Sequence, residues 1–190
     1  STSVGRTDML ALEDRLLLGQ LRHGSRDALC RIYEKYRIEL FTIAVSLLGD
    51  KDLAEDCLQD VFVRLAESGG GIRVGSNLKG YLASSVVNRA RDQIRRQARY
   101  IGCSVDDLGC CAVEPSPTQR LTENEQAATL LNAVTQLPSE QREVFVLHAQ
   151  AGLGFREIAR IQDTPLRTAH SRYRYAIEKL RELLREGTEP

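Results

Sequence analysis

The stretch GFREIARIQDTPLRTAHSRYRYAIEKL, from Gly154 to Leu180, decides the fold of the carboxyl-terminal part of the chain. It indicates a short helix through Ile158 and Ala159, a tight break, and a longer helix with Thr164 as N-cap and Pro165 at the first helical position. The longer helix carries an apolar stripe at the helical period, formed by Ala169, Tyr173, Ala176, Ile177, Leu180 and Leu184. These proportions predict a helix-turn-helix.

The polar face of the longer helix is rich in hydrogen-bond donors. In a helix-turn-helix the amino-terminal half of the second helix faces base edges in the major groove, where donors are needed. The predicted DNA-binding residues of this segment are Arg156, Arg167, Thr168, His170, Ser171, Arg172 and Arg174. The pattern alone is equally compatible with a helix hairpin whose charged face is simply solvated.

A second basic segment runs from Lys79 to Ile101. It holds six basic residues against one acidic residue, although the whole chain balances 26 Lys and Arg with 26 Asp and Glu. Local charge decides what a surface attracts, and each arginine that neutralises a phosphate releases a counterion. We therefore expect this helix to contact a polyanion.

The remaining sequence indicates an all-α protein of two small helical domains joined by a flexible linker. Apolar residues at helical spacing cover 10–101, and a stretch without a sustained period, rich in Gly, Pro and Ser, covers 102–121. Helical spacing resumes over 122–187, which contains the helix-turn-helix. We expect residues 1–9 to form a disordered tail.

Several function classes lack support in the sequence. His23, His148 and His170 lie far apart without carboxylates or thiols at metal-ligand spacing, and no phosphate-binding loop is present. We expect no metal, cofactor, small-molecule substrate or enzymatic activity. The apolar stretches are too short to span a bilayer, and the beginning of the chain lacks the pattern of a signal peptide, which predicts a cytoplasmic protein without membrane insertion.

The cysteines favour reduced thiols. There are five of them, and their spacing suits neither a disulfide framework nor a zinc site. A thiol switch at Cys103, Cys110 and Cys111 is an alternative, since a linker exposes its side chains.

The ordered set of segments resembles the extracytoplasmic-function sigma factors, the small two-domain members of the bacterial sigma-70 family. The likeness rests on LLGDKDLAEDCLQDVFVRL, on LKGYLASSVVNRARD, and on the segment LPSEQREVFVLHAQAGLGFREIARIQDTPLRTAHSRYRYAIEKLRELL. It covers nearly the whole chain except the first residues and the linker. It implies a transcription initiation subunit that binds core RNA polymerase and promoter DNA, and that is held inactive by an anti-sigma factor.

The resemblance also implies roles for individual residues. The helix from Ala54 to Phe62 would dock on polymerase, with Asp56, Gln59, Asp60 and Arg64 as candidates. The loop from Glu67 to Leu78 and the basic helix after it would open and hold the minus-ten element. The candidates there are Asn77, Lys79, Asn88, Arg89, Asp92, Arg95 and Arg96. The helix-turn-helix would read the minus-thirty-five element.

The chain departs from the family pattern at positions that bear on specificity. Tyr81 stands where Trp is common, and Asp163 stands where the turn usually has Gly. Arg167 replaces another usual glycine, and Ala169 and Tyr175 also differ from the common residues. The promoter sequence therefore cannot be carried over from relatives.

A helix-turn-helix regulator that binds operators without polymerase is the alternative from another class. It predicts tight binding by the protein alone, as a dimer on a palindrome. It gives no reason for the acidic face of DLAEDCLQDVF.

Overall fold

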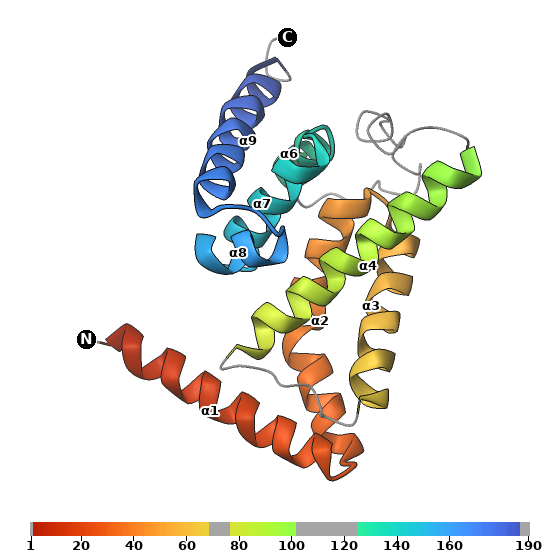
Figure 1. Cartoon of the computed structure of the whole chain (residues 1–190), viewed down its shortest axis with the longest axis vertical. Helices are drawn as coiled ribbons and strands as arrows, with labels where there is room; N and C mark the ends of the chain where they lie inside the picture. Colours follow the sequence, from red (N-terminus) through yellow and green to blue (C-terminus); the bar gives the residue numbers. More distant parts are fainter. Residues whose placement is uncertain (1, 69–76, 102–124, 187–190) are drawn as a thin grey trace.

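The computed structural model describes residues 2–68, 77–101 and 125–186, and over these residues the chain forms eight helices and no strand. The helices are α1 (Thr2–Arg22), α2 (Arg26–Leu48), α3 (Lys51–Glu67), α4 (Leu78–Ile101), α6 (Glu125–Thr135), α7 (Ser139–Ala149), α8 (Phe155–Ile161) and α9 (Leu166–Glu186). Figure 1 shows α1 to α4 on one side and α6 to α9 on the other. We call them the amino-terminal unit and the carboxyl-terminal unit. The prediction of an all-α fold is confirmed.

The turn between α2 and α3 is specified locally. Gly49 ends α2 in a left-handed conformation (φ 72°) that glycine adopts without steric cost, and its N–H donates to the Val45 carbonyl at 2.8 Å. The Asp50 side chain then accepts from the Leu53 N–H at 2.9 Å and caps α3. Adjacent C-cap and N-cap residues allow α3 to pack back against α2.

Helix α1 is attached to α2 by a charged cluster. Lys35 Nζ donates to Glu13 Oε2 and Asp14 Oδ1, both at 2.7 Å, and the Tyr36 hydroxyl donates to Asp14 Oδ2 at 2.7 Å. The hydrogen bond from Lys35 lowers the pKa of Glu13. Burial of Lys35 opposes its charged form, but the hydrogen bonds to both carboxylates raise its pKa. The cluster thus gives hydrogen-bond donors to the carboxylate of Asp14, which is buried.

Residues 2–9 correct a prediction, because they belong to α1 and do not form a disordered tail. No proline interrupts this stretch, and a helix that is already nucleated is extended at little cost. The predicted linker and its three cysteines lie outside the described residues, as does most of the loop after α3.

The two units share one hydrophobic core. The carboxyl-terminal end of α2 is buried on all its faces from Ile43 to Leu48, including the polar Ser46. One side of it packs within the amino-terminal unit, and the other meets α6 and α7. Val146 and Leu147 of α7 are completely buried in the same cluster. The units are therefore packed against each other, and neither buries its apolar surface alone.

The carboxyl-terminal unit contains the predicted helix-turn-helix, α8 and α9. Asp163 adopts φ 50° in the turn, the left-handed conformation expected where the family commonly has glycine. The prediction that Thr164 caps α9 with its side chain is wrong, because Thr164 Oγ1 is buried without a hydrogen-bond partner in the described part of the chain. Helical hydrogen bonding begins at Pro165, whose carbonyl accepts from Thr168 and Ala169.

Candidate nucleic-acid interface

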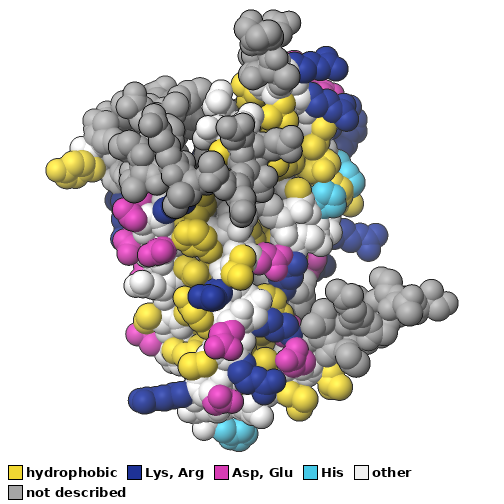
Figure 2. All heavy atoms as spheres, turned by 180° about the vertical axis from the view of Figure 1, so that it is seen from behind, with side chains coloured by type: hydrophobic (Ala, Val, Ile, Leu, Met, Phe, Trp, Pro, Cys, Tyr) yellow, Lys and Arg dark blue, Asp and Glu magenta, His cyan; other side chains and the backbone are white. Residues whose placement is uncertain are grey.

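The outer face of the helix-turn-helix exposes basic side chains. Arg156 of α8 and Arg167 and Arg174 of α9 are exposed, as predicted for residues that meet DNA. Figure 2 shows Lys and Arg side chains spaced along the edge of the molecule formed by α9. Arg174 pairs with Glu178 at 3.8 Å, but both side chains are more than half exposed, so this pair holds the arginine weakly. These arginines are accessible to a phosphate backbone.

Arg172 lies in a different environment from its neighbours on α9. Its Nη1 donates to Gln162 Oε1 at 2.9 Å and its Nη2 to Glu140 Oε2 at 2.5 Å, and its side chain is only 18% exposed. The Ser171 hydroxyl donates to the Thr168 carbonyl at 3.0 Å. Arg172 therefore joins α9 to the turn and to the start of α7.

An aromatic cluster sets the angle between α7, α8 and α9. Phe155 of α8 stacks on His148 of α7, at 4.3 Å between ring centroids, and its ring is tilted against that of His170 of α9, at 4.1 Å. Tyr173 meets Phe155 edge-on at 5.4 Å. His148 Nδ1 also lies 2.9 Å from the Leu153 carbonyl oxygen. His170 is exposed on one side and packed on the other, so the cluster presents it at the outer face.

Helix α4 presents part of its predicted DNA-binding set to solvent. Asn88, Arg95 and Arg96 are exposed, and Asp92 is half-buried. Arg89 is turned toward α3, where it forms an ion pair with Asp60 and is only 14% exposed. The structure thus brings together one residue predicted to bind DNA and one predicted to bind polymerase.

The start of α4 faces the carboxyl-terminal unit. Asn77 Oδ1 accepts from the Gly80 N–H at 3.0 Å, and Asn77 Nδ2 donates to Glu157 Oε1 of α8 at 2.9 Å. Lys79 pairs with Glu39 of α2 at 2.5 Å. These two predicted DNA-binding residues already have protein partners.

Helix α3 has one buried face and one exposed face. Ala54, Cys57, Leu58, Val61, Phe62 and Leu65 are buried against α2 and α4. Asp56, Gln59 and Arg64 are exposed on the opposite side, and Asp60 is half-buried. Burial raises the pKa of the Cys57 thiol to about 12, and its sulfur lies 3.7 Å from the Val86 carbonyl oxygen. The exposed face is available to a partner.

Sequence reasoning missed the residues that join the two units. Glu143 of α7 accepts from Arg91 and from Gln162, and Arg142 donates to the Leu47 carbonyl of α2. In the sequence, Arg91 is one of the six basic residues between Lys79 and Ile101, and Glu143 is one of several charged residues in a helical segment. Arg142 and Glu143 directly precede the buried Val144. Charged side chains that are buried need partners, so this position in the sequence was the one signal of a contact with another helix.

Neither a metal site nor a membrane-spanning helix is found in the described part of the chain. No cluster of three His, Cys, Asp or Glu side chains suited to a metal ion occurs among the residues whose side chains are described. Within the described helices, none is both long and apolar enough to cross a membrane.

Comparisons with known proteins match both units of the chain. The family model of Sigma-70 region 2 matches residues 32–100, and that of Sigma-70, region 4 matches residues 127–180. The RNA polymerase sigma-H factor of Pseudomonas aeruginosa is 26% identical, with 92% of this chain and 97% of that protein covered. The RNA polymerase sigma factor CarQ of Myxococcus xanthus is 28% identical, over 88% of this chain and 95% of that protein.

Solved structures show the same fold. The sigma factor RpoE of Bartonella quintana, in complex with the anti-sigma factor NepR, matches with a TM-score of 0.64 at 27% identity, over 82% of this chain and 97% of that one. CnrH, in complex with the cytosolic domain of CnrY, matches with a TM-score of 0.65 at 22% identity, over 93% and 99%.

Three features define a sigma-type transcription factor: region 2 precedes region 4, α4 is basic, and α8 and α9 form a helix-turn-helix. The chain belongs to the sigma-70 family of RNA polymerase sigma factors, within its extracytoplasmic-function group. This is a family of non-enzymatic factors for the initiation of transcription.

Proposed function

We propose that the chain binds core RNA polymerase and directs it to specific promoters, using three exposed surfaces. The observation that carries the proposal is the match to region 2 followed by region 4 on a fold that exposes an acidic α3 face, a basic α4 face and a basic α9 face. The first surface, formed by Asp56, Gln59, Asp60 and Arg64, docks on polymerase.

The basic face of α4 holds the minus-ten element. Asn88, Arg95 and Arg96 are exposed there and can reach phosphates or unpaired bases. Holding an unpaired strand offsets an unstacking cost of a few kcal/mol, which requires stacking or hydrogen-bonding partners. Half-buried Tyr81 is an aromatic side chain near the start of the same helix. Asn77, Lys79, Arg89 and Asp92 complete the proposed set.

The helix-turn-helix reads the minus-thirty-five element. Arg156, Arg167, Arg174 and His170 are exposed on its outer face, whereas Thr168, Ser171 and Arg172 are partly buried. Contacts from arginine to phosphate fix the register of a helix in the major groove, and this role suits Arg167 near the start of α9. The carboxyl-terminal unit thus supplies the second promoter contact.

The partners follow from this role. The relative from Bartonella quintana was crystallised with its anti-sigma factor, and we extend such a partner to this chain. A polymerase subunit acts in the cytoplasm, and it needs no cofactor, substrate or enzymatic activity of its own.

In-vitro transcription with bacterial core polymerase and fragments of the native genome tests the proposal. Starts that depend on the protein are expected, and a folded protein that yields none contradicts it. Co-elution with core polymerase on gel filtration separates this function from that of a stand-alone regulator, which would elute apart. Asp56→Lys should reduce co-elution, whereas Glu34→Lys, an exposed charge reversal on α2, should not.

A further inference from the structure

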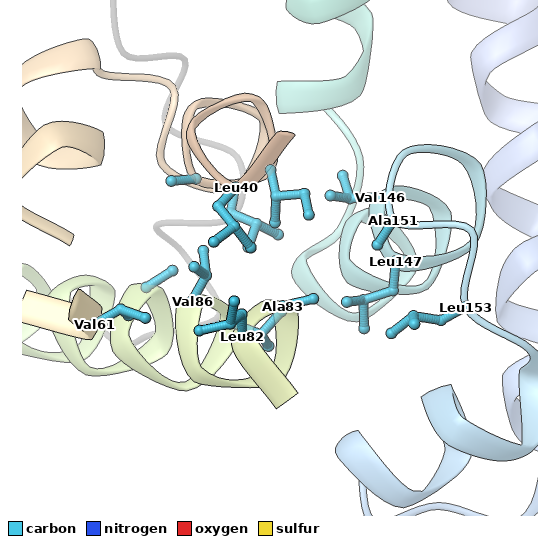
Figure 3. Close-up of a cluster of buried hydrophobic side chains, with 14 of the residues drawn as sticks. Leu40, Val61, Leu82, Ala83, Val86, Val146, Leu147, Ala151 and Leu153 are labelled. Carbon is cyan, nitrogen blue, oxygen red and sulfur yellow. The ribbon is translucent and has the colours of Figure 1, made fainter. Parts of the chain in front are cut away.

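Helix α4 has a packed part and a projecting part. Figure 3 shows Leu82 and Ala83 of its first half among the buried side chains of the core. Further along, Gln93 Nε2 donates to the Leu53 carbonyl at 3.4 Å, so α4 passes the start of α3 at this level. Figure 1 shows the end of α4 extending beyond α3. We call residues 95–100 the arm of α4.

The arm exposes nearly all of its side chains. Ala98 is buried, and the exposed residues are Arg95, Arg96, Gln97, Arg99 and Tyr100. Tyr100 is 94% exposed, whereas Tyr33 and Tyr175 are 39% and 49% exposed. Contact between water and an aromatic ring costs free energy, which is recovered when the ring packs against a flat apolar surface. The arm therefore offers an aromatic ring with almost its whole surface accessible.

The basic residues of α4 fall into two groups. Those in the packed part each pair with a carboxylate of another helix: Lys79 with Glu39, Arg89 with Asp60, and Arg91 with Glu143. The arginines of the arm form no ion pair with a carboxylate in the described part of the chain. Arg99 Nε donates to the Arg95 carbonyl at 3.3 Å, which is a contact within the helix. The charge that α4 offers to a polyanion is thus concentrated in the arm.

Unpaired arginines beside an exposed ring suit single-stranded DNA. Sites for single strands combine positive charge along the phosphates with aromatic side chains on which the bases stack. Arg96 and Tyr100 are four residues apart, so they are neighbours on one face of the helix. A duplex would engage the arginines alone, because its bases already stack on one another. The exposed ring therefore favours an unpaired strand over a duplex.

The distance along α4 indicates where this strand would meet the arm. Asn88 and Tyr100 are twelve residues apart, which is about 18 Å along the helix axis. Bases in a stacked strand are about 3.4 Å apart. A strand with one base at Asn88 would therefore reach Tyr100 about five bases further along.

We infer that the arm of α4 is a binding site for single-stranded DNA, in which Tyr100 stacks on an unpaired base and Arg95, Arg96 and Arg99 contact the neighbouring phosphates. The inference rests on the proposed function where it assigns this strand to the opened minus-ten element, and it adds Arg99 and Tyr100 to the proposed residues. Every base has a flat face, so stacking tolerates any base at this position. The arm holds an opened strand without reading its sequence.

Fluorescence of the free, full-length chain tests the site without polymerase. The chain has no tryptophan, so Tyr100→Trp places a single indole in the arm. A single strand of about ten bases should quench this indole at low salt, because the base stacks on it. A hairpin duplex of the same base composition should quench it far less. Tyr33→Trp on α2, where the tyrosine is 39% exposed, is the matched control and should respond to neither.

Fluorescence anisotropy with a labelled single strand separates stacking from phosphate binding. Tyr100→Ala should weaken binding by roughly tenfold, whereas Tyr100→Phe should not, because the ring and not the hydroxyl stacks. With an abasic strand of the same length, Tyr100→Ala should bind as the native chain does. Arg96→Ala should reduce the salt slope by about 0.7, the value for one phosphate of a single strand. Arg37→Ala, an exposed arginine of α2, is the control and should leave the slope unchanged.

The outcomes separate the arm site from the proposed function. Quenching by the single strand, weaker binding by Tyr100→Ala and native binding by Tyr100→Phe support the site. Equal quenching by the duplex, an equal loss in Tyr100→Phe, or no binding of the strand by the native chain overturns it. Transcription with core polymerase but without binding of the strand overturns the arm site alone. Binding of the strand without any transcription contradicts the proposed function alone.

Discussion

Arg89 of α4 and Asp60 of α3 form an ion pair that joins the basic helix to the acidic one. Arg89 is largely buried, and its Nε is without a hydrogen-bond partner among the described residues, so Asp60 is the carboxylate that balances its charge. The two helices that are proposed to meet DNA and polymerase are thus coupled through one contact. A change to Asp60 acts on the fold as well as on any partner.

Asp60→Asn is expected to lower the free energy of unfolding by about 1–2 kcal/mol, because it leaves a desolvated guanidinium with a weaker acceptor. Thermal unfolding followed by circular dichroism measures the loss. Asp56→Asn, an exposed site on the same helix, should stay within about 0.5 kcal/mol of the native value. Equal stability of the two variants would show that the ion pair is not structural.

Arg167 and Arg172 should respond differently to replacement by alanine. Loss of Arg172 removes hydrogen bonds to Gln162 and Glu140 and should lower stability with little change in the salt dependence of DNA binding. Loss of exposed Arg167 should leave stability unchanged and reduce the salt slope by about 0.9, the value for one phosphate contact. Fluorescence anisotropy with a duplex over a salt series measures the slopes. A reduced slope for Arg172→Ala would show that this arginine contacts phosphate.

Leu147→Ala is expected to lower the free energy of unfolding by about 2–5 kcal/mol, because it opens a cavity in the core that the two units share. Urea denaturation of the full chain measures it. Leu130→Ala on α6, where the leucine is 42% exposed, is the control and should have a small effect. A small effect at both sites would mean that α7 is not packed as described.

The ion pair of Glu13 with Lys35 should make the free energy of unfolding depend on pH. Lys35 lowers the folded-state pKa of this carboxylate, so its contribution to stability is complete above the unfolded pKa near 4.5 and is lost as the pH falls through the lower folded value. Glu13→Gln should therefore flatten the loss of stability as the pH falls below about 4.5. Urea midpoints across that range provide the measurement, and identical profiles for both proteins would contradict the assigned hydrogen bond.

Cys30 and Cys57 should differ in reactivity. Cys30 is exposed, whereas Cys57 is buried and its pKa is about 12, so almost no thiolate forms there at neutral pH. Iodoacetamide at pH 8, followed by peptide mass mapping, should modify Cys30 within minutes and Cys57 only after unfolding. Rapid modification of native Cys57 would contradict its placement between α3 and α4.

Local patterns predicted the parts of the fold that depend on neighbours in sequence. The two helices of the helix-turn-helix, the apolar stripe of α9 through Ala169, Ala176 and Leu180, and the left-handed Asp163 follow from residue type and spacing, and the structure contains all three. The side-chain cap of Thr164 does not form. A hydroxyl can bond the backbone or be buried by its surroundings, and residue type alone does not decide between these outcomes.

Long-range contacts were not predictable in the same way. Ser46 is a polar residue that is completely buried in α2, and its hydrogen-bond partner Gln150 lies 104 residues further along the chain. Arg172 has the donor chemistry of a DNA contact, but its partner Glu140 lies 32 residues earlier in the chain. The type of a residue specifies which groups its side chain can bind, whereas tertiary packing decides which of those groups lies beside it.

The end of α2 that is buried on every face has a practical consequence for dissecting the protein. A fragment that stops after α4 would expose the part of α2 that α6 and α7 cover, together with the face of Ala83 that meets Leu147 of α7 (Figure 3). Contiguous apolar patches of this kind promote self-association. Such a fragment should therefore aggregate or dimerise at concentrations where the full chain stays monodisperse. Substituting Ala83 with serine should improve its solubility.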